Sequence, residues 1–167
     1  MVNNYVGLHR GPIDHEASSV INAIASGLIS MGDAVRLNTT IPGTELLPQV
    51  EAVDTAGELV YGIAVGGDAD GIYGTGAIGT ATSGTTATNV AGEGVVVVTQ
   101  GRCLARVTGN VLVGEALVAE GTGDGLLIVP AIPAGTDRVI AIALQVNTTG
   151  EGIIAVDVQR EVGIVGN

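Results

Sequence analysis

The residues of this sequence that could do chemistry fall in three places, and the first is a pair of histidines near carboxylates. His9 and His15 lie close to Asp14 and Glu16, and a histidine beside carboxylates can hold a metal ion or transfer a proton. Such a site needs a rigid shell around its ligands. The surrounding segment contains glycine and proline and offers no such shell, so we expect no metal site here.

The second place is an acidic stretch in the middle of the chain. Asp68 and Asp70, followed by Gly71, resemble the opening of a calcium loop, where alternate acids supply oxygen ligands. The rest of that pattern is missing, because Ile72 stands at the third ligand position and Gly79 stands where a bidentate glutamate belongs. We therefore favour a solvated acidic loop and expect neither a bound metal ion nor another cofactor.

The third place is the single cysteine. Cys103 lies between Arg102 and Leu104 in a strand-like run, where a small apolar residue packs in a core more often than it acts as a nucleophile. The chain has no Gly-x-Ser-x-Gly elbow and no lysine, which excludes Schiff-base chemistry and a P-loop. Paired carboxylates could hydrolyse glycosides, but sugar sites usually need aromatic surfaces. We predict that the protein is not an enzyme.

Charge and composition restrict the partners. The 167 residues include 17 acids and 6 arginines, for a net charge of −11, and the aromatic residues are three tyrosines alone. A polyanion is repelled by such a surface and finds little to stack on, so nucleic acid is not an expected partner. The best apolar stretch, residues 20–31, is too short for a membrane span. The acidity suits either a high-salt habitat or a strongly solvated outer face.

The elements that would position any site are short strands. Runs rich in Val, Ile and Leu alternate with Gly, Pro, Asn and Asp, which predicts an all-β fold, a small β-barrel or sandwich without crossover helices. Residues 17–31 fit either a short amphipathic helix or a strand broken at Gly27. The remaining expected strands are 34–37, 49–53, 59–65, 94–100, 103–107, 116–119, 126–129, 139–146 and 153–158.

An internal two-fold repeat organises these strands. Three segments recur in the same order in both halves: 32–35 matches 114–117, 60–65 matches 139–144, and 92–98 matches 150–156. The copies differ chiefly between the second and third matches, where the first copy has the long segment 66–91 and the second has the short segment 145–149. The sequence therefore predicts a Gly/Thr-rich insertion loop at 66–91, which is too poor in large apolar side chains to supply core.

The ends of the chain differ from this framework. Residues 1–16 are expected to form an extended N-terminal arm, residues 17–160 the β-barrel or sandwich domain, and residues 161–167 a C-terminal tail. Asn38 and Asn147 begin glycosylation sequons in form, and we expect both to be ordinary turn residues after a strand.

The order and spacing of these strands and Gly-Asp turns carry a family resemblance. Segments 29–35, 60–65, 94–101, 113–117 and 139–144 are similar to the capsid cement, or head decoration, proteins of tailed phages and related archaeal viruses. The likeness covers about residues 17–160. It implies a small β-barrel or sandwich that assembles, often as a trimer, on the outside of an icosahedral shell. It brings no catalytic residues.

From this resemblance we expect a structural protein of the virion that binds the outer surface of an assembled capsid and stabilises it. Its partners would be the major capsid protein and further copies of itself, with a trimer favoured. The arm is the expected capsid contact, because an extended segment can add a strand to an exposed sheet edge; its residues are Asn4, Tyr5, Val6 and Leu8, with Tyr5 as the aromatic anchor. The alternative is a β-rich receptor- or ligand-binding module of a spike, tail fibre or cell surface.

Overall fold

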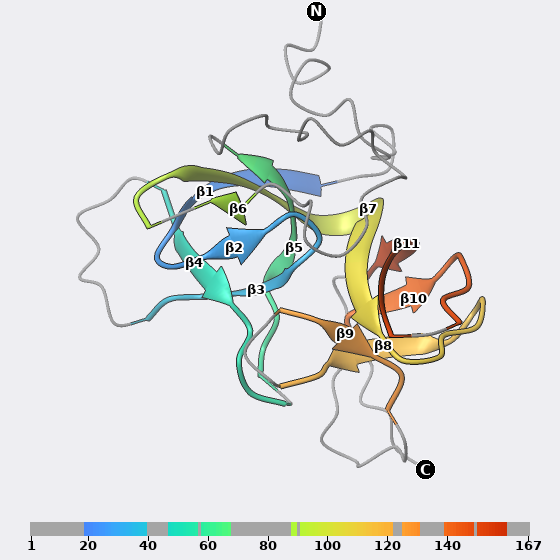
Figure 1. Cartoon of the computed structure of the whole chain (residues 1–167). Helices are drawn as coiled ribbons and strands as arrows, with labels where there is room; N and C mark the ends of the chain where they lie inside the picture. The colour runs from blue at the N-terminus through green and yellow to red at the C-terminus, as the bar shows by residue number, and fades with distance from the viewer. Residues whose placement is uncertain are drawn as a thin grey trace, which may run out of the picture.

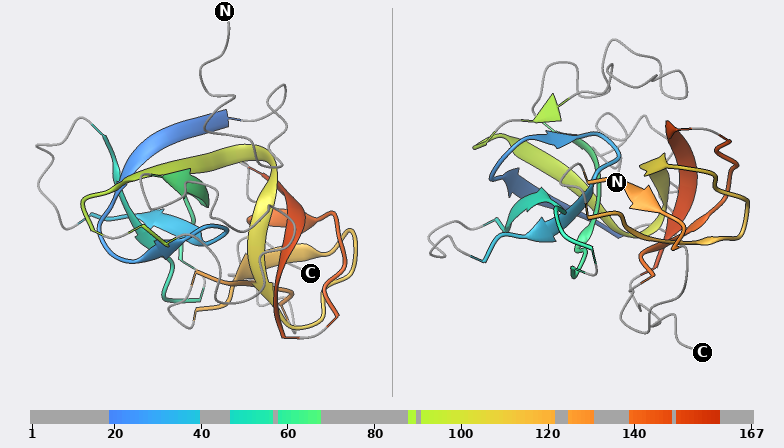
Figure 2. Two further views of the ribbon diagram at one scale, coloured as in Figure 1. Left: turned by 45° about the horizontal axis from the view of Figure 1, so that its top comes forward. Right: turned by 60° about the horizontal axis from the view of Figure 1, so that its bottom comes forward.

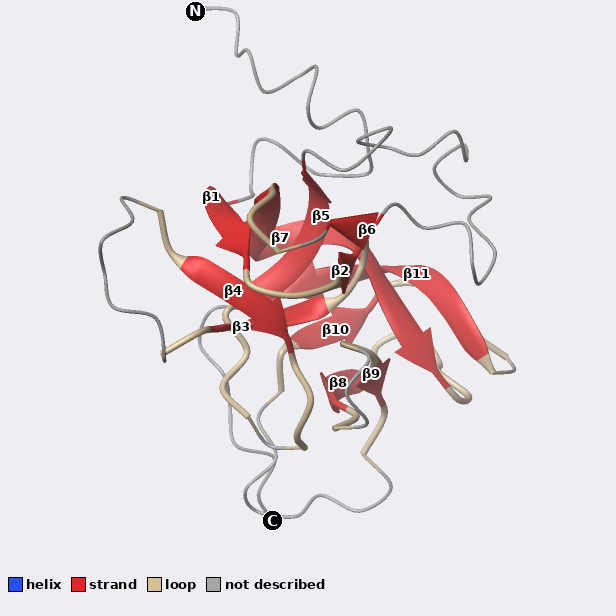
Figure 3. Cartoon of the chain, turned by 60° about the vertical axis from the view of Figure 1, so that its left-hand side comes forward, coloured by secondary structure: helices blue, strands red, loops and turns tan. Residues whose placement is uncertain are grey.

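A computed structural model describes residues 19–39, 47–56, 58–67, 88–89, 91–121, 125–130, 139–148 and 150–159. Every element in these ranges is a β-strand, which confirms the predicted all-β class (Figure 3). No helix that could cross a bilayer is found in them. The predicted arm and tail lie outside the described residues, as does most of the predicted insertion loop.

The strands follow one another closely along the chain, as the short apolar runs predict. Within the predicted segment 17–31, the described residues 19–31 take the strand alternative, with a bend at Gly27. The strands are β1 (Ser19–Ala25), β2 (Ile29–Ser30), β3 (Ala34–Leu37), β4 (Gln49–Ala52), β5 (Gly62–Gly67), β6 (Thr88–Asn89), β7 (Gly94–Thr108), β8 (Ala116–Ala119), β9 (Leu127–Ile128), β10 (Ala141–Ala143) and β11 (Glu151–Val158). The predicted insertion at 66–91 thus contributes its ends to β5 and β6.

Nine of these strands form one sheet that closes on itself twice. The first ring runs β1-β4-β3-β5-β7 and closes because β1 also pairs with β7. The second ring runs β7-β11-β10-β8-β9 and closes through a parallel pairing of β7 with β9. We call these rings barrel 1 and barrel 2. They lie side by side, with the blue-to-green strands in barrel 1 and the orange and red strands in barrel 2 (Figures 1 and 2).

The long strand β7 belongs to both barrels. The sequence predicts two strands separated at Gly101, whereas the structure has one strand of 15 residues. Gly101 has a φ of 102°, a conformation that a side chain would strain. Residues before it pair with β1 and β5 of barrel 1, and residues after it pair with β11 of barrel 2. Figure 1 shows β7 continuing from one barrel to the other. The pairing register places the glycine at this passage.

The sequence repeat corresponds to the two barrels. Equivalent strands pair with the same register in the two barrels. The parallel pairing of β1 with β4 in barrel 1 is equivalent to the parallel pairing of β7 with β9 in barrel 2. The corresponding cross-strand partners are Val35↔Gly62 and Leu117↔Ala141, Leu37↔Val50 and Ala119↔Leu127, and Ala25↔Val50 and Val107↔Leu127. The duplicated unit is thus a complete five-stranded barrel.

One part of the sequence repeat is displaced by a residue in the structure. Ala64 pairs with Val97, and its equivalent Ala143 pairs with Val156. Val97 therefore corresponds to Val156, whereas the sequence match aligns it with Ala155. The sequence match was wrong in register here because a run of four valines fits its partner equally well one residue along.

Each barrel encloses its own apolar core. The eight buried residues of the barrel 1 core all have equivalents, by strand register, among the buried residues of barrel 2, so the two cores are duplicated as well. The pairs are Ala23 and Ala105, Ala25 and Val107, Ile29 and Val111, Val35 and Leu117, Val50 and Leu127, Ala64 and Ala143, Val95 and Ile154, and Val97 and Val156.

An ion pair and two close backbone approaches hold the barrels together. The Asp33 carboxylate, buried in the turn before β3, lies 2.6 Å from Nη1 of Arg106 on β7. The described residues between β8 and β9 pack on barrel 1, where the N–H of Ala34 donates to the carbonyl of Gly125 at 2.7 Å. A Cβ on Gly121 would overlap the backbone of Ala56. Beside the apolar residues that the barrels bury between them, the junction therefore uses residues without bulk and a charge pair whose carboxylate is buried.

Candidate functional site

The described part of the chain carries a groove at one end of barrel 1, beside barrel 2. Its volume is about 940 Å³. Ser19 on β1, the first described residue, lines the groove. Most of its lining is apolar and partly exposed, and the main contributors are Val20, Ile21, Leu37, Leu59 and Tyr61.

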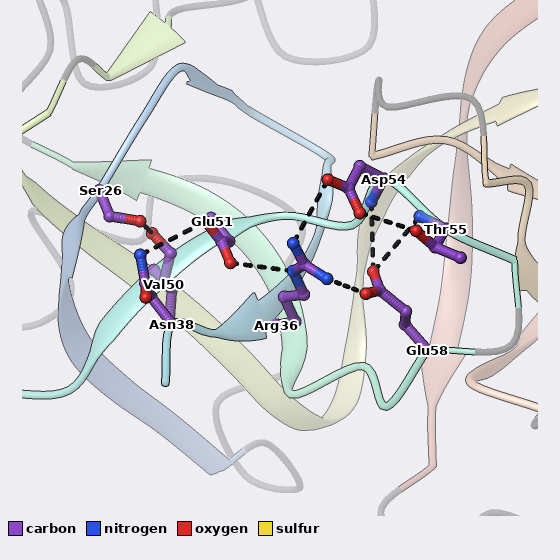
Figure 4. A network of polar contacts seen from close by, with 8 residues as sticks. All are labelled: Ser26, Arg36, Asn38, Val50, Glu51, Asp54, Thr55 and Glu58. Carbon is purple, nitrogen blue, oxygen red and sulfur yellow. Dashed lines mark hydrogen bonds and ion pairs between the residues drawn. The ribbon is translucent and has the colours of Figure 1, made fainter. Parts of the chain in front are cut away.

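One side of the groove is polar, and Arg36 on β3 organises it (Figure 4). Its guanidinium forms ion pairs with Glu58 and, at 3.3 Å, with Asp54. Its Nε lies 3.0 Å from Glu51 on β4 but lacks the alignment of a hydrogen bond. Glu58 also accepts from the backbone N–H groups of Asp54 and Thr55. Because these side chains are partly exposed, each pair adds little stability, and the cluster leaves the rim with net negative charge.

These side chains suit recognition better than chemistry. The groove holds hydroxyls at Ser19 and Thr99 and a phenol at Tyr61, and the carboxylates on its rim are already paired with Arg36. In the described ranges, no group of three or more His, Cys, Asp or Glu side chains could hold a metal ion. An apolar lining with a charged rim is typical of a surface that binds another protein.

The cysteine lies away from the groove, in the core of barrel 2. Cys103 is fully buried, which confirms the predicted packing role. Burial raises the pKa of its thiol far above the ordinary value, and the negative charge of Asp157 raises it further. The thiolate, which is the reactive form, is therefore not populated at neutral pH.

Arg106, at the junction of the barrels, is charged at every pH of interest. Burial acts to lower the pKa of its guanidinium, but the carboxylates of Asp33 and Glu151 outweigh this effect and raise that pKa above its ordinary value. The group therefore serves the barrel junction as a permanent cation and not as a proton donor.

A second surface is an apolar tip on barrel 2. Leu112 and Val113, in the turn before β8, are 51% and 60% exposed, and Val146 is 49% exposed in the facing segment. The bridge between Val111 and Asn147 brings the two segments together. In the equivalent turn of barrel 1, Met31 is only 8% exposed. The tip is thus a feature that barrel 1 does not share.

The site residues predicted from the sequence are not tested by this geometry. The arm residues Asn4, Tyr5, Val6 and Leu8 lie outside the described residues, and so do the acidic-loop residues Asp68 and Asp70. The turn expected at Asn147 is not found, because this residue forms an antiparallel bridge with Val111, and its side chain donates to the carbonyls of Gly109 and Gly150 at 2.6 and 2.9 Å. Asn38 directly follows β3 but is not in a turn either, since its N–H donates to the carbonyl of Gln49 on β4 at 2.9 Å.

Sequence reasoning missed the groove and its Arg36 cluster. A signal was present in the repeat, because the equivalents of the cross-strand pair Arg36 and Glu51 are Val118 and Ile128. Where one copy of the repeat has a charged pair and the other has an aliphatic pair, the two equivalent surfaces have different roles. Aligning the repeat position by position, with the strand register known, would have found it.

Comparison with solved structures shows a likeness in fold. No family model matches the chain, and no curated protein matches it in sequence. Among solved structures, it is similar to the N base of the head fibre gp8.5 of bacteriophage phi29, with a TM-score of 0.54 and 12% sequence identity. The match covers 87% of this chain and 97% of that one. At this identity, the likeness concerns the fold.

Proposed function

We propose that this chain is a structural protein of a phage head, which binds the outer surface of the assembled capsid and stabilises it. The observation that carries the proposal is the match to a phage head fibre base over nearly the whole of both chains. The resemblance of the strand and turn order to head decoration proteins points to the same place on the virion. Neither likeness brings catalytic residues, and the proposal includes no enzymatic activity.

The proposed mechanism is thermodynamic linkage. A protein that binds the assembled lattice but not the separated subunits adds its binding free energy to the cost of disassembly. Many copies on one shell need only modest affinity each, because bridging neighbouring capsomers raises their effective concentration. The net charge of −11 opposes non-specific aggregation of unbound copies.

Two surfaces are proposed to make the capsid contact. The arm would add a strand through Asn4, Tyr5, Val6 and Leu8 to a sheet edge of the major capsid protein, because the strands of both barrels already pair in closed rings. The apolar tip of barrel 2 would support this contact, since exposed aliphatic side chains that lie together mark interaction sites.

Deleting residues 1–16 tests the arm. We expect the truncated protein to fold, with an unfolding midpoint near that of the full chain, and to leave purified capsids largely unoccupied when bound protein is quantified by gel densitometry. Deleting residues 161–167 is the matched control and should leave occupancy unchanged. Full occupancy by a folded protein without the arm would refute the arm as the capsid contact.

A receptor-binding module is the second candidate, because the matching structure is a fibre base. The two candidates predict different targets for the same labelled protein. A decoration protein should be retained by purified capsids and washed from host cells, whereas a receptor-binding module should be retained by the cells. Retention by cells alone would replace the capsid proposal.

A further inference from the structure

We infer that the groove of barrel 1 binds a second copy of this chain, through the outer face of that copy's barrel 2, so that copies associate head to tail. The argument compares the groove with the contact that joins the barrels inside one chain. It does not depend on the proposed capsid function, because it concerns the free protein in solution.

Inside the chain, one end of barrel 2 is closed by the outer face of barrel 1. That outer face is apolar, and its residues belong to the same buried cluster as the core of barrel 2; they are Ala34, Ile63, Val65, Val96 and Val98. This explains why the run of four valines in β7 is buried on both faces, since alternate residues face the core of barrel 1 and the junction. The junction is thus a barrel end that packs on a barrel side.

The groove lies at the end of barrel 1 that is equivalent to the junction end of barrel 2, and no described segment closes it. Five of the residues that line it are equivalent, by strand register, to residues of barrel 2 that lie at the junction. Ser19, Ile21, Leu37, Thr39 and Tyr61 correspond to Gly101, Cys103, Ala119, Gly121 and Ile140. Four of these five equivalents are buried, whereas Leu37 is 42% exposed and the other groove residues are also accessible. Barrel 1 therefore presents a docking end with nothing from the described chain covering it.

The matching side surface is also present, and no segment of the described chain covers it. The equivalents in barrel 2 of the outer face of barrel 1 include Ala116, Ile142, Leu144 and Ala155, all partly exposed. They form a continuous strip, because Ile142 pairs with Ala116 across β10 and β8, and the N–H of Leu144 donates to the carbonyl of Ala155 at 2.9 Å. Each chain thus carries one unpaired end and one unpaired side of the type that it already joins internally.

Differences at the two surfaces make the contact between chains looser than the one within a chain. Thr39 stands where Gly121 allows the backbone of Ala56 to approach, so a second copy lies farther out. Asp157 replaces Val98 on the side surface, and the groove rim carries Glu51, Asp54 and Glu58 around one arginine. Like charges therefore face each other, and salt should strengthen the association.

This contact is heterologous, because an end of one copy meets a side of the next. Such a contact generates a closed ring if the rotation closes and an open chain if it does not. A substitution can therefore disrupt one of the two surfaces and leave the other intact. In an isologous dimer, by contrast, one substitution changes both sides of the contact.

The test is sedimentation velocity of the full chain over a range of concentrations, in about 1 M salt, where the screening length is about 3 Å. Leu59→Glu spoils the groove at a 62% exposed position, and Ile142→Glu spoils the side of barrel 2. Each is expected to weaken association at least about tenfold, because a charge would be buried without a partner. Leu28→Glu, 70% exposed and lining neither surface, is the control and should associate like the parent chain.

The decisive measurement is a mixture of the Leu59→Glu and Ile142→Glu proteins. Each retains the surface that the other lacks, so the mixture should form dimers of one chain of each kind and grow no further. Leu144→Glu replaces Ile142→Glu if the latter fails to fold, as judged by its unfolding midpoint. A parent chain that stays monomeric at every concentration overturns the proposal, and so does a mixture that stays monomeric or single variants that associate like the parent.

Discussion

Barrel 1 and barrel 2 share a framework and differ in what surrounds it. The turn before β3 and the turn before β8 are the clearest case. In barrel 1 the N–H of Ser30 donates to the Asp33 carboxylate at 2.6 Å, and in barrel 2 the N–H of Leu112 donates to the Glu115 carboxylate at 2.7 Å. Only Asp33 also binds Arg106 of the other barrel. The local turn is thus conserved between the copies, while its acid has acquired a role at the junction in one copy alone.

Comparing equivalent positions of the two barrels indicates which residues serve the fold and which serve function. Positions equivalent in both barrels and buried in both serve the barrel itself, as Ile29 and Val111 do. Positions that are equivalent but differ in exposure or charge serve the junction, the groove or the tip. Substituting equivalent positions in pairs therefore separates the two roles.

The largest difference is expected at the acids of the two turns. Asp33→Ala removes the turn acceptor and also leaves Arg106 poorly compensated at the junction, so we expect it to lower the free energy of unfolding by about 3–5 kcal/mol. Glu115→Ala removes the turn acceptor at a more exposed site and should cost about 1 kcal/mol. Urea denaturation followed by circular dichroism measures both. Equal losses would mean that the ion pair contributes nothing to the junction.

The next difference is expected between two glycines with positive φ. Gly121 and Gly114 have φ values of 84° and 88°, so alanine should strain the backbone by about 1–2 kcal/mol at either. A Cβ at Gly121 would also overlap Ala56, whereas a Cβ at Gly114 would have no neighbour within 4 Å. We expect Gly121→Ala to cost about 1–3 kcal/mol more than Gly114→Ala.

Thermal unfolding of the two alanine variants is the measurement for this pair. The variant at Gly121 should have the lower midpoint, because the overlap separates the barrels or distorts the loop between β8 and β9. If both variants unfold at the same temperature, the close approach of barrel 2 to Ala56 is not a feature of the protein in solution.

The smallest effect on stability is expected at the tip of barrel 2. Replacing Leu112 and Val113 together by serine removes exposed apolar surface and should change the free energy of unfolding by less than about 0.5 kcal/mol. Under the capsid proposal, the same protein should occupy fewer sites on purified shells. Leu28→Ser, at an exposed position between β1 and β2, should bind as the parent does. Unchanged occupancy for the double variant would exclude the tip from the contact.

Much of the framework could be predicted from the sequence. The strands at 34–37 and 116–119 are found with the predicted bounds, and the order of the repeat is that of the strands. These predictions succeeded because alternation of apolar residues and turn glycines is a local property. The groove could not be predicted in the same way, since Ser19, Arg36 and Ile140 meet only when both barrels are folded.

The sequence by itself determined that the protein is built of short strands in two related halves, because strand propensity and turn residues act over a few neighbours. Tertiary structure alone decided that each half closes into a barrel, that β7 continues through Gly101, and that Val97 and not Val98 faces the core of barrel 1. The physical reason for the orientation of β7 is that it contains four consecutive valines. Valine can be buried on either face of the strand and in either register, so only pairing with β1 and β5 and packing against barrel 2 select one arrangement.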